Sequence, residues 1–200
     1  MNRVIRWTED GWEMEPDQRH VDIQVKELGL SEARPVSTPG ESTVLNEHDA
    51  TRYRAMAARA NYLAADRTDL MYATKEICRG MAKPTEGGWK KLKRLGRYLL
   101  GNGRLTTHYA WQGEEETVTS FSGSDWAGCK VTAKSTSGGV IMVGGHFIKG
   151  WSRTQNHVTL SSAEAELIAM VKCTAETMGV QSMLREWGRQ ISSTVYADSS

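Results

Sequence analysis

The spacing of apolar residues changes once along the chain, close to Gly101-Asn102-Gly103, and no other feature limits the possible folds as strongly. Over residues 49–100, apolar residues recur every three or four positions, as they do on one face of an α-helix. From residue 105 onward, short runs rich in β-branched and aromatic residues alternate with glycine-containing or charged turns. The sequence therefore predicts a mostly helical segment followed by a part built around a sheet.

The helical segment carries three apolar stripes. They are Tyr53, Met56, Ala57, Ala60 and Leu63; Leu70, Ala73, Ile77 and Met81; and Leu92, Leu95, Tyr98 and Leu99. A break at Lys83-Pro84-Thr85 precedes the third helix, which is predicted to begin at Glu86. We expect each stripe to be the apolar face of its helix.

Residues 1–45 have mixed character. Residues 3–7 are predicted to form a short strand, Gly11 a turn, and residues 17–28 a helix that ends at Gly29. Residues 34–40 read R-P-V-S-T-P-G, and their two prolines and one glycine predict an extended linker.

After residue 104, short runs separated by turn residues are predicted to be strands. These runs are residues 105–111, 117–122, 138–143 and 146–151. Gly144-Gly145, between the last two runs, is typical of a hairpin turn.

A long helix is predicted to follow, from Ser161 to about Trp187, with Gly188 ending it. Ser161 and Glu164 have the spacing of a capping box. Residues 194–197 form one last predicted strand. Apart from the run at 105–111, the order is strand, strand, strand, helix, strand, which predicts an α+β or α/β domain.

Bulk composition is that of an ordinary globular chain, with 39% hydrophobic residues, 24% charged residues and a formal net charge of +1. No apolar run reaches the roughly 20 residues of a membrane span, and the first residues lack the apolar core of a signal peptide. Cys78, Cys129 and Cys173 are odd in number and widely spaced, which favours free thiols in a reducing compartment. We therefore expect an intracellular protein, cytoplasmic or nuclear.

Three motifs follow one another in the sheet-containing part: S-G-S-D-W-A-G at 122–128, K-S-T-S-G-G at 134–139 and L-S-S-A-E-A-E-L at 160–167. In this order they resemble the ribonuclease H domain of copia-type LTR-retrotransposon Pol polyproteins, and R-P-V-S-T-P-G together with residues 53–73 resembles the segment that precedes that domain. The resemblance implies a truncated Pol polyprotein with a ribonuclease H-like mixed sheet. It divides the chain into residues 1–45, a remnant of the reverse transcriptase and a linker; 46–104, a helical connection segment; and 105–200, an incomplete ribonuclease H-like domain.

The resemblance also implies a chemistry. Ribonucleases H cleave the RNA of RNA–DNA hybrids with two divalent ions, Mg²⁺ or Mn²⁺, that carboxylates hold. Glu166 matches the family's acid on the first helix, and Asp198 matches the acid at the end of the following strand, so both are implied metal ligands and catalytic residues. Asp125 is a weaker catalytic candidate, whose alternative role is to shape the turn after its strand. The implied partners are an RNA–DNA hybrid or another nucleic acid and the remainder of a Pol polyprotein.

The first motif departs from the family pattern at Gly123, where the family has its first catalytic aspartate. Asp125 lies two residues farther along the strand, roughly 6.6 Å away, which is too far to take over that role without a shift. The family's fourth carboxylate would lie beyond Ser200. We therefore expect no appreciable nuclease activity from this chain, and little rescue by Gly123→Asp alone.

The helix predicted to begin at Glu86 carries a basic stripe opposite its apolar face. The stripe consists of Lys90, Lys91, Lys93, Arg94 and Arg97. Such a stripe can follow a nucleic-acid backbone, and its alternative is an ordinary solvated helix face. Two other readings of the chain therefore stay open: a non-catalytic nucleic-acid-binding module, and a decayed element without a selected function.

Overall fold

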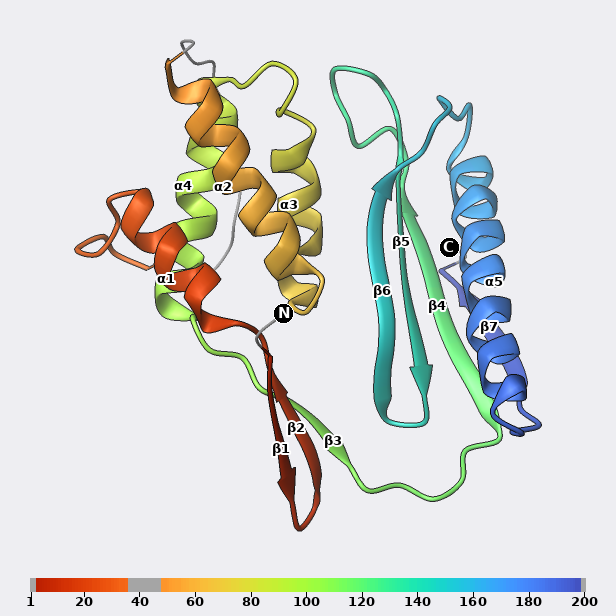
Figure 1. The fold of residues 1–200 in the computed structure, drawn as a ribbon. Helices are drawn as coiled ribbons and strands as arrows, with labels where there is room; N and C mark the ends of the chain where they lie inside the picture. Colours follow the sequence, from red (N-terminus) through yellow and green to blue (C-terminus); the bar gives the residue numbers. More distant parts are fainter. Residues whose placement is uncertain (1–2, 36–47, 199–200) are drawn as a thin grey trace. The chain divides into compact units, whose positions relative to one another are not determined.

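The computed structural model describes residues 3–35 and 48–198, and the chain divides into two compact units, Met1–His108 and Tyr109–Ser200 (Figure 1). Most of the predicted linker at 34–40 lies outside the described residues. Each unit has its own hydrophobic core.

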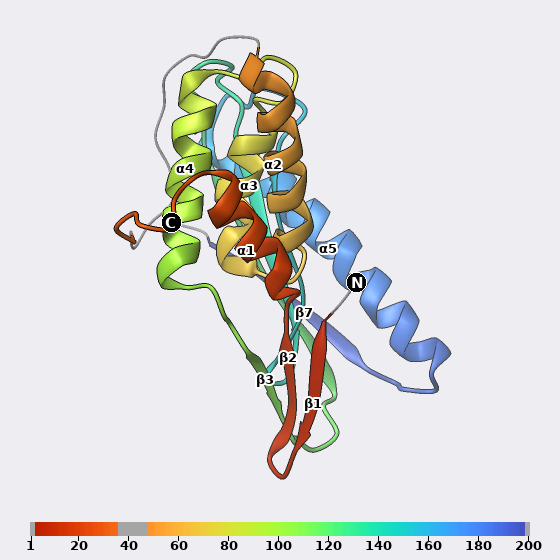
Figure 2. The same cartoon turned by 60° about the vertical axis from the view of Figure 1, so that its left-hand side comes forward.

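The first unit is built mainly from helices that lie together as a bundle (Figures 1 and 2). Its helical elements are α1 (Gln18–Glu27), α2 (His48–Ala64), the 3-10 turn η1 (Thr68–Leu70), α3 (Met71–Cys78) and α4 (Glu86–Gly101). The three predicted apolar stripes supply most of the buried core, with Met81 and Tyr98 packed at its edge. The predicted helices with apolar faces are therefore confirmed, and their stripes pack into one core.

Tyr53 lies at the centre of this bundle, with no solvent exposure. Its hydroxyl donates a hydrogen bond of 2.6 Å to the carbonyl of Ile77, and burial raises the pKa of Tyr53 to about 12. Gly88 of α4 packs against the Tyr53 ring so closely that an added Cβ would lie 2.7 Å from the hydroxyl oxygen and 2.9 Å from Cε2. The Gly88 amide also donates to the Thr85 hydroxyl, which caps the start of α4. Gly88 therefore sets how closely α2 and α4 approach.

A β-hairpin opens the first unit and extends away from the bundle (Figure 2). Its strands are β1 (Val4–Thr8) and β2 (Gly11–Glu15), which pair antiparallel, and β3 (Thr107–Ala110) follows β2 in the sheet order. The predicted strand at 3–7 is confirmed, whereas the interpretation of Gly11 as a simple turn missed β2. The predicted strand at 105–111 is shorter than expected. Short strands with exposed residues have a weak periodic signal, so pairing with a neighbour decides where they begin and end.

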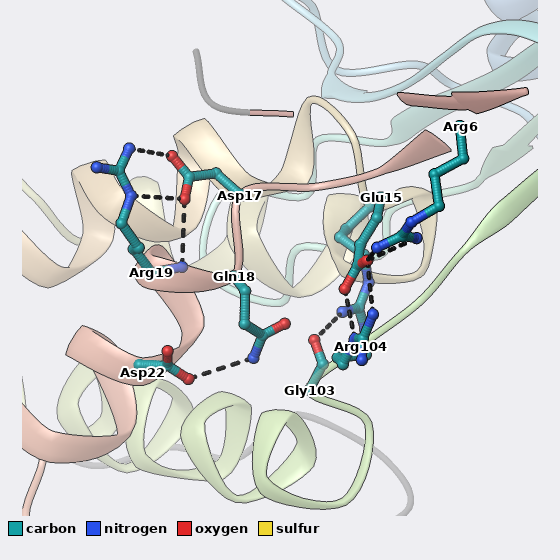
Figure 3. A network of polar contacts seen from close by, with 9 residues as sticks. Arg6, Glu15, Asp17, Gln18, Arg19, Asp22, Gly103 and Arg104 are labelled. Carbon is teal, nitrogen blue, oxygen red and sulfur yellow. Dashed lines mark hydrogen bonds and ion pairs between the residues drawn. The ribbon is translucent and has the colours of Figure 1, made fainter. Parts of the chain in front are cut away.

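Two ion-pair clusters lie where this hairpin leads into α1, and one of them joins the hairpin to the chain after α4 (Figure 3). The carboxylate of Glu15 is buried and receives hydrogen bonds from Arg104, one of 2.8 Å, and from Arg6 at 3.3 Å. The hydrogen bonds from Arg104 lower the pKa of Glu15 against the opposing effect of burial. Asp17 caps α1 by accepting from the amide and guanidinium of Arg19, whose hydrogen bonds lower the pKa of Asp17 to about 2.

Arg67 is the largest fully buried side chain in the part of the chain that the structure describes. Its guanidinium donates to both carboxylate oxygens of Asp69, at 3.0 and 2.7 Å, and to the carbonyl of Gly103 at 3.2 Å. The Tyr98 hydroxyl donates to the same carboxylate at 2.9 Å. Burial raises the pKa of Asp69, but the hydrogen bonds and charge of Arg67, together with the other hydrogen bonds to this carboxylate, leave the pKa lowered. This network ties the turn before α3 to α4 and to the chain that follows it.

The second unit is a sheet with one long helix on one face (Figure 1). Its elements are β4 (Thr117–Asp125), β5 (Thr136–Val143), β6 (His146–Thr154), α5 (Ser162–Glu186) and β7 (Ser192–Ala197). The sheet order is β6-β5-β4-β7, in which β7 runs parallel to β4 and the other neighbours are antiparallel. The predicted α+β fold and the order strand, strand, strand, helix, strand are confirmed.

The ends of α5 follow the predicted signals. Ser161 accepts a hydrogen bond from the Glu164 amide at 3.2 Å, and the Glu164 carboxylate accepts from the Leu160 amide at 2.7 Å, one residue before the amide of an ideal capping box. Gly188 follows the helix with φ at +81°, a conformation that favours glycine. Within the described residues, neither α5 nor any other helix is long and apolar enough to cross a membrane.

We predict that Gly88→Ala lowers the free energy of unfolding by about 1–3 kcal/mol, because the new methyl group collides with the Tyr53 ring. Gly179→Ala is the matched control: Gly179 lies in α5 with nothing within 4 Å of its built Cβ, so this change is expected to stabilise by about 0.5–1 kcal/mol. Urea denaturation followed by circular dichroism measures both. A neutral or stabilising Gly88→Ala would show that α2 and α4 are not in this close contact.

Candidate functional site

The candidate acids of the second unit come from elements that meet at one edge of the sheet. Because β4 and β7 are parallel, their carboxyl ends lie at the same edge, where open α/β sheets commonly place ligands. Ser122 pairs with Ala197 in this ladder, and the Asp198 amide continues it by donating to the Ser122 carbonyl at 3.2 Å. The first turns of α5 reach the same end of β4 through Glu166.

Glu166 is held against β4 by two hydrogen bonds. Its Oε1 accepts from the amide of Ser124 at 2.9 Å and from the Ser124 hydroxyl at 2.8 Å. The other oxygen, Oε2, is buried without a hydrogen-bond partner among the described residues. One half of the carboxylate therefore joins α5 to β4, and only the other half is available to a ligand.

Gly123, where the resemblance implies a catalytic aspartate, lies between Ser122 and Ser124 of β4. It pairs with Gly138 of β5, and a Cβ built on it would meet no atom within 4 Å. Successive strand residues point to opposite faces, and Ser122 and Ser124 point toward α5, so a side chain at 123 would point to the face away from α5. The Gly123 position thus has room for a side chain, but on the face of the sheet opposite the Ser124–Glu166 contact.

Asp125 ends β4 and organises the turn that follows. Its Oδ1 accepts a short hydrogen bond from the amide of Thr136, and its carbonyl accepts from the Gly128 amide at 3.5 Å. A Cβ on Gly128 would collide with the Asp125 carboxylate, so a side chain there would displace this carboxylate. These contacts favour the turn-shaping role of Asp125 over a role as metal ligand.

Other residues of the first two motifs form hydrogen bonds with each other and with the loop before α5. The Trp126 indole donates to the carbonyl of Thr159 at 3.2 Å, and the Ala127 amide donates to the Ser135 hydroxyl at 3.0 Å. The hydroxyls of Ser135 and Thr159, both buried, lie 3.0 Å apart. The K-S-T-S-G-G motif therefore holds the turn after β4 and leads into β5.

Asp198 is exposed at the end of β7. Across residues 3–35 and 48–198, no group of three or more histidine, cysteine, aspartate or glutamate residues is placed to hold a metal ion. Two-metal hydrolysis needs several carboxylates around a pair of ions. Glu166 offers one oxygen, Gly123 offers none, and Asp125 faces the Thr136 amide, so the described residues do not fit a pair of divalent ions.

Two residues of the predicted basic stripe of α4 form contacts within the first unit. Lys91 donates to Glu76 at 3.4 Å, and Arg97 donates to the carbonyl of Arg34 at 2.7 Å. Burial raises the pKa of Glu76. The hydrogen bonds and charges of Lys75 and Arg79 together outweigh this effect and lower the pKa of Glu76 to about 2. Lys91 and Arg97 therefore have structural partners within the first unit.

Solvent exposure varies along the stripe. Lys90 and Lys93 are exposed, and Arg94 is half-buried. They lie within one turn of each other on α4, so they form the part of the stripe that a phosphate backbone could reach.

Sequence reasoning missed three polar residues of the second unit, Ser124, Ser135 and Thr159. Their hydroxyl contacts join segments that are distant in the sequence. Nothing in the local sequence indicates such partners, because a hydroxyl residue in a strand or loop has the same local pattern with or without them.

Comparison with known proteins adds an independent line of evidence. The chain is 34% identical over 177 residues to the Retrovirus-related Pol polyprotein from transposon RE2 of Arabidopsis thaliana, covering 83% of this chain and 12% of the relative. It is 32% identical over 190 residues to the corresponding polyprotein from transposon RE1 of the same plant, covering 90% of this chain and 13% of the relative. An uncharacterized mitochondrial protein of Arabidopsis thaliana is 31% identical over 164 residues, covering 79% of this chain and 68% of that protein.

No family model matches the chain, and no solved structure gives a significant match. The chain spans about an eighth of the length of the two plant polyproteins (12% and 13%). The similarity nevertheless covers 83% and 90% of this chain, so it extends across both units. The chain is therefore a member of the copia-type family of retrovirus-related transposon Pol polyproteins.

Proposed function

We propose that the unit Tyr109–Ser200 is a ribonuclease H-like domain of a Pol polyprotein that has lost the ability to hydrolyse RNA–DNA hybrids. The observation that carries this proposal is the pair of features at the end of β4: Ser124 binds Glu166, while Gly123 leaves the family's aspartate position without a carboxylate.

Support for the ribonuclease H-like fold comes from topology and motif placement together. The mixed sheet β6-β5-β4-β7 with α5 on one face has the element order that the resemblance implies. Each of the three motifs lies where that fold would use it: at the end of β4, at the start of β5, and at the start of α5.

Support for the loss of activity comes from the ligands that remain. A hydrolytic pair of divalent ions needs carboxylate oxygens from several elements, and each missing ligand weakens both metal binding and the positioning of water. With Oε1 of Glu166 bound to Ser124, the best match to a family ligand holds the helix to the strand. We infer that Glu166 now has a structural role.

We predict that the protein gives no cleavage of an RNA–DNA hybrid above background in Mg²⁺ or Mn²⁺. Gly123→Asp is also expected to give none, because the new carboxylate would point to the face away from the Ser124–Glu166 contact. Gel analysis of an end-labelled hybrid measures the activity, with a complete copia-type ribonuclease H domain as positive control. Cleavage by the unmodified protein that disappears in Glu166→Ala would contradict the proposal.

A second candidate function is binding of nucleic acid without cleavage, through the exposed basic residues of α4. The solvent exposure of Lys90 and Lys93 favours it. A contact that involves two or three phosphates releases a similar number of counterions, so affinity should fall with salt with a slope of roughly −2 to −3 on a log–log plot.

We predict that the double variant Lys90→Glu/Lys93→Glu lowers affinity for a duplex at least about 10-fold at low salt. The variant removes two positive charges that can contact phosphates and replaces them with negative charges that repel phosphates. Lys26→Glu/Lys130→Glu, at exposed lysines on α1 and in the turn after β4, is the matched control, because it makes the same change in net charge. Fluorescence anisotropy against salt concentration measures the effect. Equal losses in the variant and the control would remove α4 as a specific binding surface, and no binding at low salt would remove the function.

A further inference from the structure

The side of α5 that faces away from the sheet carries exposed apolar residues. Leu167, Val171 and Met178 are 53%, 62% and 58% exposed, whereas Ala165, Ala169 and Cys173 on the other side are buried against the sheet. Burial of apolar side chains is the usual means by which a helix is stabilised, so their exposure in one row is a sign of an interaction surface.

The row follows the periodicity of a helix that packs against another helix. Leu167, Val171, Thr174, Met178 and Ser182 are separated by four, three, four and four residues, which keeps them on one face over about 22 Å. Between Leu167 and Ser182 this face carries no charged residue. We call these residues, together with Ala175, the α5 stripe.

The hydroxyl of Thr174 does not make the centre of the stripe polar. It donates a hydrogen bond of 2.9 Å to the carbonyl of Met170, one turn earlier in the same helix. Its methyl group and the side chain of Ala175 are small, so they allow the backbone of a second helix to come close at this point.

The α5 stripe is symmetric about the midpoint between Thr174 and Ala175. Val171 lies four residues before Ala175, and Met178 lies four residues after Thr174. Leu167 lies eight residues before Ala175, and Ser182 lies eight residues after Thr174. If a second α5 helix lies antiparallel to the first, each residue of one half therefore meets its counterpart from the other half of the stripe.

The charges at the two ends of the stripe have the same symmetry. Glu164 lies eleven residues before Ala175, and Arg185 lies eleven residues after Thr174; both are exposed. In an antiparallel pair, each Glu164 would lie opposite an Arg185 of the other helix, whereas a parallel pair would place like charges together. Opposite charges that flank an apolar seam select partner and orientation.

From these features we propose that the α5 stripe is a self-association surface that binds a second copy of this chain, with the two α5 helices antiparallel about a two-fold axis near Thr174 and Ala175. Two-fold interfaces are self-complementary by construction, and the sequence symmetry of the stripe meets that requirement. Standard interfaces bury about 1,200–2,000 Å² with about 20–30 residues on each side, whereas the α5 stripe has six, so we expect a weak and reversible dimer.

The experiment is sedimentation equilibrium of the full chain from about 10 µM to about 1 mM, a range chosen for a weak interface. We expect the average mass to rise with concentration toward that of a dimer. Val171→Glu and Met178→Lys should each lower the association constant at least about 10-fold, because each would place a charge in the apolar seam. Val131→Glu is the matched control, since Val131 is 93% exposed outside the stripe, and it should leave the association constant unchanged.

Mixing the two stripe variants tests the orientation. In an antiparallel pair, position 171 of one chain lies opposite position 178 of the other. In a mixed dimer, the glutamate of the Val171→Glu chain would therefore attract the lysine of the Met178→Lys chain. The mixture should associate more strongly than either variant alone.

Three results would each overturn the proposal. The first is a chain that stays monomeric at about 1 mM, the upper end of the range for a weak interface. The second is a Val171→Glu effect no larger than that of Val131→Glu. The third is a mixture of the two stripe variants that associates no more strongly than its components.

Discussion

The close approach of α5 to β4 is the contact on which the second unit depends. β4 places Ser120 and Ser122 beneath the helix, and such small side chains let the helix lie near the strand. The Ser120 hydroxyl lies 2.7 Å from that of Thr177, and at the far end of the strand Ser124 binds Glu166. Because β4 also pairs with β5 on one side and β7 on the other, this contact fixes where every candidate acid lies.

These contacts explain how the motif residues can be present without a complete set of metal ligands. The D-W-A-G residues are needed for the turn after β4, since Asp125 binds the Thr136 amide and a side chain in place of Gly128 would displace the Asp125 carboxylate. Glu166 is needed for the β4–α5 contact. These residues stabilise the fold whether or not a metal binds, and Gly123 is the motif position that has no such contact to make.

Sequence reasoning was most successful where the signal is local. The apolar stripe around Tyr53 and the cap at Ser161 depend on residues a few positions apart, and both were predicted. The contact of Ser124 with Glu166 joins residues 42 positions apart, and the buried Arg67 binds the carbonyl of Gly103 from 36 positions away, so no local pattern could indicate either. The face toward which position 123 points likewise became clear only once α5 was placed on the sheet.

The structural role of Glu166 can be measured directly through metal binding. Electron paramagnetic resonance of Mn²⁺ titrated into the protein should show no site tighter than about 10 mM that depends on this residue, and Glu166→Gln should bind Mn²⁺ as weakly as the unmodified chain. Two Mn²⁺ ions bound per chain at submillimolar concentration, and lost in Glu166→Gln, would contradict the assignment of Glu166 as a link between α5 and β4.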